Sequence, residues 1–507
     1  MPIKTTLEKY GFHAFLLPLF FILHNYLLYY GLASGSTAIW LFIKTELVFT
    51  GSFLLLLLIT RHANRSLQLT TLLGFLVLFY GVFKDFFDDT LHVHLLARYI
   101  VLVPLLAVLA ILLVVVIARK KDFRKVNLFQ NSLLLLFILF EVVQLVRLGT
   151  DNLLQHNPLL KNNRLNPDTL RVPSERPDVY FLVFDSYPGN GFLRDFLQYD
   201  NTPFDTALQK RGFYVVAHPR SNYNRTQFSI SATLNMEYLD GLSPWSGAKY
   251  YNQAIQGIQH AVVPRVFIHC GYRMFNLSVF NWGAYPALMK ENFLTLPENQ
   301  MLLYNTLPER FRHDIAWNFG LVENYLTPGR QQLYQKQDEE KMNAIKSYNH
   351  IAIDSLFKIP AADTAGPKFV YAHLYLPHIP LSYDSNGKPV QAYTGTVTPA
   401  MSKAAVLSYL KYTNKIALRA VDSILQHARR PPVIIVQSDH GYRDLPAGMA
   451  PPMRYFDNYS AFYFPGKNYT MLNDSLTNVN EFAIIFNTWF NTRIPMLKDS
   501  SIYLPFP

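Results

Sequence analysis

The chain has 507 residues, of which 50% are hydrophobic and 16% are charged, and this length exceeds one ordinary hydrophobic core, so two or three domains are expected. Its formal net charge is +11, but basic runs are short outside residues 119–125 and no nucleic-acid motif is present. The charge therefore favours an anionic membrane surface and argues against a nucleic-acid partner. The single cysteine, Cys270, excludes an intramolecular disulfide and a cysteine-based metal cluster, and is expected to be a small buried apolar residue.

Long apolar segments dominate the first 150 residues. A helix needs about 20 such residues to cross a bilayer. Five segments meet this requirement, at 12–32, 38–60, 69–87, 95–118 and 126–147. They continue well past the N-terminus, so a cleaved signal peptide does not explain them. We therefore expect a five-helix transmembrane domain over residues 1–149.

The loops between these segments predict their orientation. Residues 61–66 carry two arginines and residues 119–125 carry five basic side chains, whereas residues 31–37 are neutral and 84–89 are net acidic. The positive-inside rule therefore puts the N-terminus and the two basic loops in the cytoplasm. With five spans, everything after about residue 150 is extracytoplasmic, as in a multi-pass protein of a cell membrane.

Three charged residues, Glu46, Glu141 and Arg147, lie in or near the expected spans. Such residues have either a structural role, in which the side chain extends to the membrane surface or pairs with another helix, or a functional one, in which it contacts a lipid head group. Both interpretations stay open here.

The rest of the chain begins with a linker, predicted at 150–176 from its scattered prolines and asparagines. Residues 177–507 then alternate helical and strand patterns. Short apolar runs at 179–184 and 433–436 indicate buried strands, and 402–430 shows helical spacing. This alternation predicts an α/β domain with a largely parallel central sheet and helices on both faces.

Acidic and imidazole side chains follow the two apolar runs. Asp185 comes directly after the first, and Asp439 and His440 follow the second. Ligands of parallel sheets bind beyond the carboxyl ends of the strands, so these three side chains are expected to converge. Two carboxylates and an imidazole suit one divalent metal ion, manganese or zinc. Taken singly, Asp185 is also consistent with a turn cap, and Asp439 with His440 with a helix cap or a loop hydrogen bond.

Thr226 stands just before a run that is typical of a helix. It is either an N-cap alone or a nucleophile at an anion-binding helix N-terminus, where a metal would lower the pKa of its hydroxyl group for attack on phosphorus. Ser229 and Ser231 follow within the helix and are expected to face away from such a site.

Four blocks of this chain, in this order, resemble the alkaline phosphatase superfamily. They are VYFLVFDSY (179–187), NYNRTQFSISATLNMEYL (222–239), HLYLPHIPLSYD (373–384) and VIIVQSDHG (433–441). The nearest resemblance is to membrane-anchored sulfatase-like phosphotransferases, which include lipoteichoic acid synthase and the lipid A phosphoethanolamine transferases. These proteins also have five membrane helices before an extracytoplasmic catalytic domain, and residues 177–507 are expected to form that sulfatase-like domain.

The resemblance assigns roles to individual residues. Asp185, Thr226, Asp439 and His440 match the metal ligands, and Thr226 also matches the nucleophile. His378 matches a histidine that contacts the phosphoryl group or the leaving oxygen, and it is the expected general acid because its unperturbed pKa is about 6.5. Arg443 is assigned either to the substrate anion site or to an ordinary ion pair. His373 has no clear counterpart and is expected to be packed or hydrogen-bonded.

The chain also departs from these relatives. No histidine follows His440, which favours a single metal ion over two. Thr226 is followed by Gln227, Phe228 and Ser229, so the pattern that sulfatases convert to formylglycine is absent. One cysteine cannot form the periplasmic disulfides of the phosphoethanolamine transferases, which leaves the head group open.

The resemblance implies a transferase. It would move a phosphoryl-linked head group, of the phosphoglycerol or phosphoethanolamine type, from a membrane phospholipid to an envelope glycan or glycolipid through a phosphothreonine. The alternatives are a membrane-anchored phosphodiesterase or sulfatase-like hydrolase that uses water, and a catalytically silent binding module.

Two further features bear on the setting. Glycosylation of the sequon Asn224-Arg225-Thr226 would cover the expected nucleophile, which favours a bacterial host and a bacterial inner membrane facing the periplasm. The aromatic stretch 270–330, with Trp282 and Trp317, either lines the substrate cleft or belongs to the core, and core is the preferred interpretation.

Overall fold

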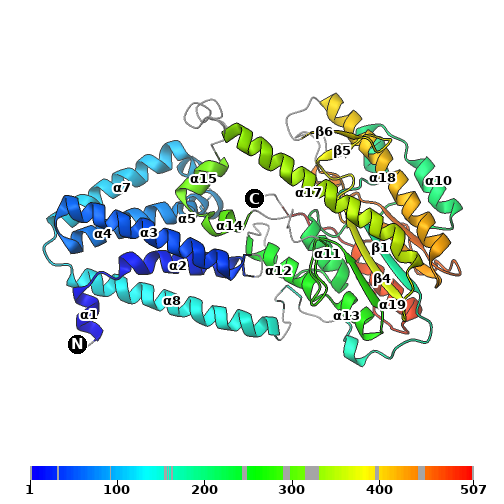
Figure 1. Ribbon diagram of the computed structural model, residues 1–507, viewed down its shortest axis with the longest axis horizontal. Helices are drawn as coiled ribbons and strands as arrows, with labels where there is room; N and C mark the ends of the chain where they lie inside the picture. The colour runs from blue at the N-terminus through cyan, green and yellow to red at the C-terminus, as the bar shows by residue number, and fades with distance from the viewer. Residues whose placement is uncertain are drawn as a thin grey trace. The chain divides into compact units, whose positions relative to one another are not determined.

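A computed structural model describes residues 3–30, 33–91, 93–153, 157, 159–160, 164–242, 248–288, 297–314, 330–393, 399–443 and 451–504 (Figure 1). The chain forms two compact units. The first consists of residues 1–156 and 295–334, and the second of residues 157–294 and 335–507.

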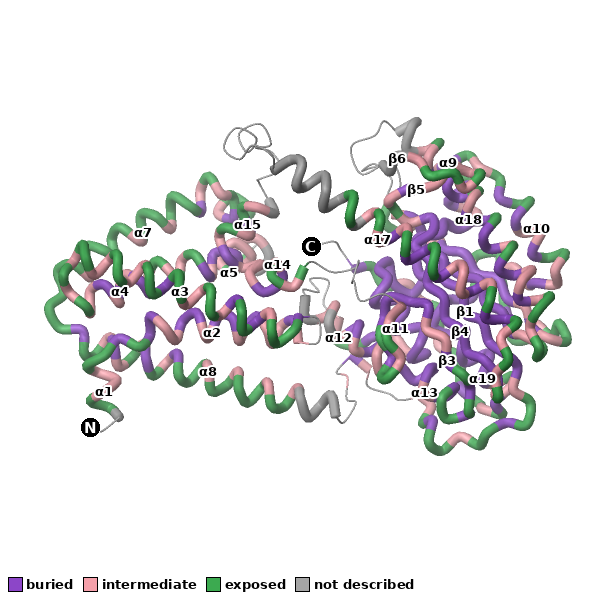
Figure 2. Tube along the Cα trace, viewed as in Figure 1, coloured by how far each residue is buried: buried purple, intermediate pink, exposed green. Residues whose placement is uncertain are grey.

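The first unit is built of helices. In chain order the described ones are α1 (Ile3–Lys9), α2 (His13–Leu28), α3 (Gly35–Thr60), α4 (Ala63–Leu78), α5 (Tyr80–Asp85), the π-helical turn Phe86–Thr90, α6 (His94–Ala97), α7 (Tyr99–Arg119), α8 (Arg124–Leu153), α14 (Glu298–Leu303) and α15 (Leu307–Asp314). Many of their apolar residues are exposed, which is typical of helices whose solvent is lipid. Figure 2 shows exposed residues along α3, α7 and α8.

The expectation of five spans is wrong. Three helices are long and apolar enough to cross a membrane, namely α3, α7 and residues Arg124–Leu148 of α8. Helix α2 has 16 residues, which rise about 24 Å and fall short of the ~30 Å hydrocarbon core. The expected span at 69–87 is broken near Phe79, where α4 and the helix that follows it bend by 55°, and it adds a fourth span only if this bent pair crosses as one.

One of the charged residues in the apolar helices is paired. Glu141 of α8 meets His24 of α2, with 2.7 Å between Oε1 and Nδ1. This contact favours the helix–helix pair over the lipid head group for Glu141.

Helices α14 and α15 belong to the first unit although the chain reaches them through the second. The Gly81 amide donates to the Asn305 carbonyl at 2.8 Å, and Arg310 forms an ion pair with Asp85. A Cβ at Gly81 would lie 2.9 Å from the Asn305 Cα, so this close approach requires glycine.

The second unit contains a six-stranded sheet in the order β2-β8-β7-β1-β4-β3. The strands are β1 (Asp178–Phe184), β2 (Tyr214–Val215), β3 (Arg273–Leu277), β4 (Lys368–Leu374), β7 (Pro432–Gln437) and β8 (Ser460–Tyr463). A separate hairpin pairs β5 (Leu381–Tyr383) with β6 (Pro389–Tyr393). All residues of β1 and β4 are buried, as expected for central parallel strands (Figure 2).

The sheet is mixed, whereas the sequence predicted a largely parallel one. Strands β7, β1, β4 and β3 are parallel, and β8 and β2 add an antiparallel edge. A parallel return needs a crossover, usually an α-helix. In the described part of the connection from β7 to β8 the only helical element is the 3₁₀ turn Pro452–Phe456, so the chain returns antiparallel.

Helices cover both faces of this sheet, as predicted. They are α9 (Asn190–Leu197), α10 (Thr202–Lys210), α11 (Thr226–Asn235), α12 (Ala248–Gln259), α13 (Val262–His269), α17 (Arg330–Lys358), α18 (Pro399–His427) and α19 (Glu481–Trp489). Successive residues of a strand point to opposite faces. Tyr180 and Leu182 of β1 pack in one core with residues of α9, α10, α17 and α18, whereas Phe181 contacts Phe482 of α19.

Two single residues expected in the core lie there. Cys270 is 1% exposed, and Trp282 is 2% exposed and stacks on Tyr371 at 5.2 Å between ring centroids. Trp317 lies outside the described residues.

Candidate functional site

The carboxyl edge of the parallel strands gathers buried titratable side chains. Asp185 follows β1, His373 lies near the end of β4, and Asp439 and His440 come just after β7. In the sheet, Val183 of β1 pairs with His373 of β4 on one side and with Gln437 of β7 on the other. None of the four titratable side chains is exposed, so the strand-end pattern leads to a fully buried cluster.

The distances within this cluster are short. His373 Nε2 lies 3.3 Å from Asp185 Oδ2, and His440 Nε2 lies 3.3 Å from Asp439 Oδ2 and 3.8 Å from Asp185 Oδ1. The convergence of Asp185, Asp439 and His440 that the sequence predicted is therefore observed.

This arrangement fits a divalent metal ion. Ligand atoms of Asp185, His373 and Asp439 all lie within 4.8 Å of one another. Asp185 Oδ1 and Asp439 Oδ2 are buried and have no hydrogen-bond partner. A buried carboxylate oxygen without a partner is costly, and a cation between the two carboxylates would satisfy both. Carboxylate oxygen with imidazole nitrogen is a ligand set that zinc and manganese accept.

His373 was expected to be packed or hydrogen-bonded, and it is both, but the structure also brings it into the cluster. Its Nδ1 lies 2.8 Å from the Tyr371 hydroxyl group, and its carbonyl accepts from the Tyr348 hydroxyl at 2.6 Å. Burial raises the pKa of both tyrosines well above the usual value, so both hydroxyls stay protonated. The strand-end signal that pointed to Asp185 applied to 368–374 as well and could have found His373.

Thr226 opens helix α11 and lies at the same place. Its Oγ1 is 3.2 Å from His440 Nε2, and its side chain is buried. The Nδ1 of His440 meets the carbonyl of Gly441 at 2.8 Å, which it can do only as a donor, so Nε2 carries the lone pair. Ser229 faces the backbone instead, because its hydroxyl donates to the Asp439 carbonyl at 2.5 Å.

Two arginines flank Thr226. Arg443 donates to the Asn224 carbonyl at 2.7 Å and is half-buried. Arg225 directly precedes Thr226, is 2% exposed and donates to the Leu504 carbonyl at 3.3 Å. Burial and the charge of Arg443 lower the pKa of Arg225 to about 10. Sequence analysis did not single out Arg225, although its place next to Thr226 was a signal.

Asn224 of the sequon is fully buried and binds Leu504 through both ends of its carboxamide. Its Nδ2 donates to the Leu504 carbonyl at 2.9 Å, and its Oδ1 accepts from the Leu504 amide at 2.8 Å. The folded chain therefore offers no room for a sugar at Asn224.

His378 lies on the loop after β4 and is half-exposed. Its Nδ1 is 2.5 Å from the Ile379 carbonyl, and its ring lies 5.8 Å from that of Tyr375. It is thus at the rim of the buried cluster, where its charge acts on Asp185.

The electrostatics favour the protonation states that a metal requires. Burial raises the pKa of Asp185, but the charge of His378 and the hydrogen bond with His373 outweigh this effect, so the pKa lies below its usual range. Burial lowers the pKa of His440, and the charge of Arg443 lowers it further. The charges of Asp439 and Asp185 raise it, but by less, so the pKa lies below its usual value. At neutral pH an ionised Asp185 and a neutral His440 are the forms that bind a cation.

No family model matches the chain, and no curated protein matches it. Solved structures do. The zinc complex of the periplasmic domain of EptC from Escherichia coli covers 64% of this chain and 85% of its own at 11% identity, with a TM-score of 0.39. The integral membrane lipooligosaccharide phosphoethanolamine transferase A from Neisseria meningitidis covers 94% of this chain and 95% of its own at 11% identity, with a TM-score of 0.38. A protein of the alkaline phosphatase superfamily from Vibrio parahaemolyticus covers 66% and 74% at 16% identity, with a TM-score of 0.33.

Proposed function

We propose that this chain is a membrane-held, metal-dependent phosphotransferase that uses Thr226 as its nucleophile. One observation carries the proposal. Two buried carboxylates with unsatisfied oxygens and two imidazoles meet a threonine hydroxyl at a helix N-terminus. This combination offers ligands for a cation and a nucleophile beside them, which is what phosphoryl transfer through a covalent intermediate requires.

Asp185, Asp439, His440 and Thr226 would hold one zinc or manganese ion, and His373 is a further ligand that the geometry supports. Such an ion lowers the pKa of a bound hydroxyl group and offsets the charge of a phosphoryl group. The arginines Arg225 and Arg443 and the first amides of α11 add positive potential on the same side as Thr226.

The reaction has two steps. Thr226 would react as its alkoxide, the form that a bound cation would favour, after its proton has gone to water. Its Oγ1 forms a bond to phosphorus while the bond from phosphorus to the diacylglycerol oxygen breaks, and protonated His378 gives that oxygen a proton. An acceptor hydroxyl then attacks the same phosphorus and returns its proton to His378, and the bond to Thr226 breaks, which leaves the Thr226 alkoxide for the next cycle. The half-exposed position of His378 suits this exchange with a substrate at the rim.

The membrane unit supports a lipid donor and an acceptor outside the cytoplasm. The basic loop 119–125 is placed in the cytoplasm by the positive-inside rule. Helix α8 follows this loop and is one of the candidate spans, so the chain after α8 lies on the extracytoplasmic side. Residues 61–66 lie on the same side as 119–125 only if the bent pair after residue 62 crosses as a fourth span. A phospholipid donor of the phosphoethanolamine or phosphoglycerol type and an envelope glycan or glycolipid acceptor fit this placement.

The test uses the full chain in detergent, supplied with zinc or manganese and a mixture of fluorescent phospholipids. Release of diacylglycerol is expected, and the lipid that is consumed identifies the head group. Mass spectrometry of the acid-quenched protein should find Thr226 carrying the phosphoryl-linked head group.

Thr226→Ala should abolish the release. Thr233→Ala, on the same helix, is the matched control and should retain it, because the Thr233 hydroxyl donates to the Ser229 carbonyl at 2.8 Å and not to the cluster. A wild-type protein that binds metal but cleaves none of the lipids would contradict the lipid donor. If the head group is transferred only to water, whichever acceptor is supplied, the result would favour the hydrolase.

A further inference from the structure

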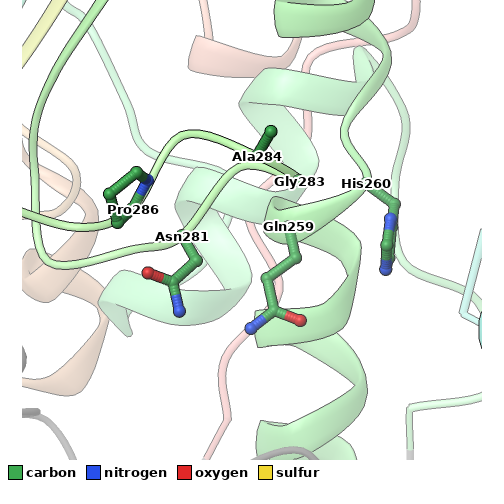
Figure 3. Close-up of a pocket in the computed structure, with 6 residues that line it drawn as sticks. All are labelled: Gln259, His260, Asn281, Gly283, Ala284 and Pro286. Atoms are coloured by element: carbon green, nitrogen blue, oxygen red, sulfur yellow. The ribbon is translucent and has the colours of Figure 1, made fainter.

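A hollow of about 500 Å³ lies on the globular unit between the end of α12 and the loop after β3. Figure 3 shows its lining residues, Gln259, His260, Asn281, Gly283, Ala284 and Pro286. Its volume is within the range of about 300–1,000 Å³ that small-ligand sites occupy.

The loop that forms this hollow is held in place by hydrogen bonds. The Asn276 carboxamide donates to the carbonyls of Phe280, Tyr285 and Pro286 at 2.7, 3.2 and 3.0 Å. The Gly283 amide donates to the Gln259 carbonyl at 3.1 Å, which ties the loop to α12. A wall fixed in this way loses little conformational freedom when a ligand binds.

Two buried residues adjacent in sequence to the lining residues contact side chains at the candidate metal centre. Strand β3 is parallel to β4, so its carboxyl end lies at the same edge of the sheet as His373. The Phe280 ring, next to Asn281, lies 6.1 Å from the His373 ring, and Trp282 stacks on Tyr371, whose hydroxyl contacts His373. A ligand in the hollow is therefore one layer of side chains away from the cluster.

The lining chemistry is polar and uncharged. In Figure 3 the carboxamides of Gln259 and Asn281 project to the same side of the loop. The Asn281 Oδ1 accepts from the Ala287 amide at 2.8 Å, so its NH₂ group is the part offered to a ligand. Burial and the charge of Arg265 lower the pKa of His260, which keeps this imidazole neutral at pH 7.

None of the described lining residues is an aspartate, glutamate, lysine or arginine. Its described lining therefore offers none of the charges that a phosphate or an ammonium head group would require. Carboxamides and a neutral imidazole form hydrogen bonds with hydroxyl groups, and Ala284 and Pro286 offer apolar surface to ring carbons.

We propose that this hollow is the acceptor subsite and that it binds a neutral sugar ring of the glycan or glycolipid. The proposal rests on the proposed function, since it assigns the hollow to the second substrate of the same reaction. The donor phospholipid, with its charged head group, uses the cluster and the arginines.

The test combines transfer with direct binding, on the full chain in detergent. The probes are the methyl glycosides of glucose, galactose and N-acetylglucosamine. Saturation-transfer NMR measures their binding, and the same glycosides serve as acceptors for the phosphoryl-linked head group. The variant is the double substitution Gln259→Ala with Asn281→Ala, and Gln253→Ala on α12, outside the lining, is the matched control.

At least one glycoside should bind the wild-type protein and the control, and the double variant should lose tenfold or more in affinity. The KM for this acceptor should rise in parallel, whereas diacylglycerol release without acceptor should stay unchanged. Binding that is absent from the wild-type protein, or equal in the double variant, would overturn the proposal. The two proposals can fail separately. If the proposed function is wrong, diacylglycerol release is absent, and the NMR measurement still shows whether a sugar binds in the hollow.

Discussion

The two ends of strands β1 and β4 are equally buried and carry very different charges. At the amino end, Lys368 Nζ lies 3.6 Å from Asp178 Oδ2, the Lys368 amide donates to Asp178 Oδ1 at 2.8 Å, and both side chains are 2% exposed or less. At the carboxyl end, Asp185 and Asp439 share a cluster with imidazoles, and one oxygen of each carboxylate has no hydrogen-bond partner.

This difference separates a structural charge pair from a candidate binding site. Asp178 Oδ2 also lacks a hydrogen bond, but the ammonium group of Lys368 stands beside it as a permanent opposite charge. The carboxyl end has no lysine or arginine in ion-pair contact with Asp185 or Asp439 among the described residues. Negative charge is therefore left for a cation to balance at one end only.

The largest effect is expected at the carboxyl end. Asp185→Asn removes a metal ligand, so phospholipid cleavage should fall by more than the ~10- to 100-fold typical of outer-shell partners. The same substitution removes a buried, incompletely satisfied carboxylate, so the thermal midpoint of the metal-free protein should stay the same or rise. Activity assays and melting curves of the chelator-treated protein measure both. An Asp185→Asn protein that still cleaves phospholipid, or whose metal-free thermal midpoint lies far below that of the wild-type protein, would contradict the comparison.

The amino end should show the reverse pattern. Lys368→Met leaves Asp178 buried without its opposite charge, which is expected to cost about 3–5 kcal/mol of folding free energy. Combining it with Asp178→Leu removes the stranded charge and should restore most of that stability. Thermal unfolding measures the loss, and metal binding per folded molecule should be unchanged in both variants. A loss of metal in the double variant would show that the two ends are not independent.

A smaller effect is expected one layer outside the cluster. Tyr371→Phe removes the hydroxyl group that orients His373 through Nδ1, and metal affinity should fall about 10- to 100-fold without a change in fold. Tyr180→Phe is the matched control, because the Tyr180 hydroxyl is buried on β1 and has no hydrogen-bond partner. Titration with zinc in the presence of a competing chelator compares the two. Equal affinities would exclude Tyr371 as a positioning residue.

The smallest effect concerns Glu481, a buried acid beside Ser460, the first residue of β8. Burial raises its pKa to about 8 from the ordinary 4.5, and its Oε1 accepts from the Ser460 hydroxyl at 3.0 Å. Between these two values the folded chain holds a proton that the unfolded chain has released. Stability should therefore be greatest near pH 5 and fall towards pH 8, by at most about 1.4 kcal/mol per pH unit. Glu481→Gln should flatten this decline in thermal midpoints measured from pH 5 to pH 8, and an unchanged slope would assign it to other groups.

From the sequence, the site residues at the ends of strands could be predicted, but the order of the strands in the sheet could not. Asp185, Asp439 and His440 were predicted because each follows an apolar run, and Thr226 because it opens a helical pattern. The position of His373 at the end of 368–374 was a usable signal, but its place beside Asp185 depends on β4 lying next to β1, and that strand order cannot be read from one sequence.

The predictions of five spans and of a largely parallel sheet were wrong for the same reason: local composition does not reveal where a helix ends or how two strands are connected. Helical length was inferred from apolar runs, but α2 is shorter than its run and the run at 69–87 bends near Phe79. The direction of β8 depends on a connection whose described part has no α-helix, which composition does not reveal. The place of Arg225 next to Thr226 was readable in the sequence, but its proximity to Arg443 is a property of the fold alone.

The most direct test of the comparison is a count of bound metal. The full chain is purified in detergent, loaded with zinc or manganese and analysed by elemental mass spectrometry beside Asp185→Asn, Asp439→Asn and the Lys368→Met/Asp178→Leu double variant. One divalent ion per chain is expected in the wild-type protein and in the double variant, and none in the two single aspartate variants. A wild-type protein that holds no stoichiometric metal, and that cleaves phospholipid equally well in the presence of a chelator, would contradict the account.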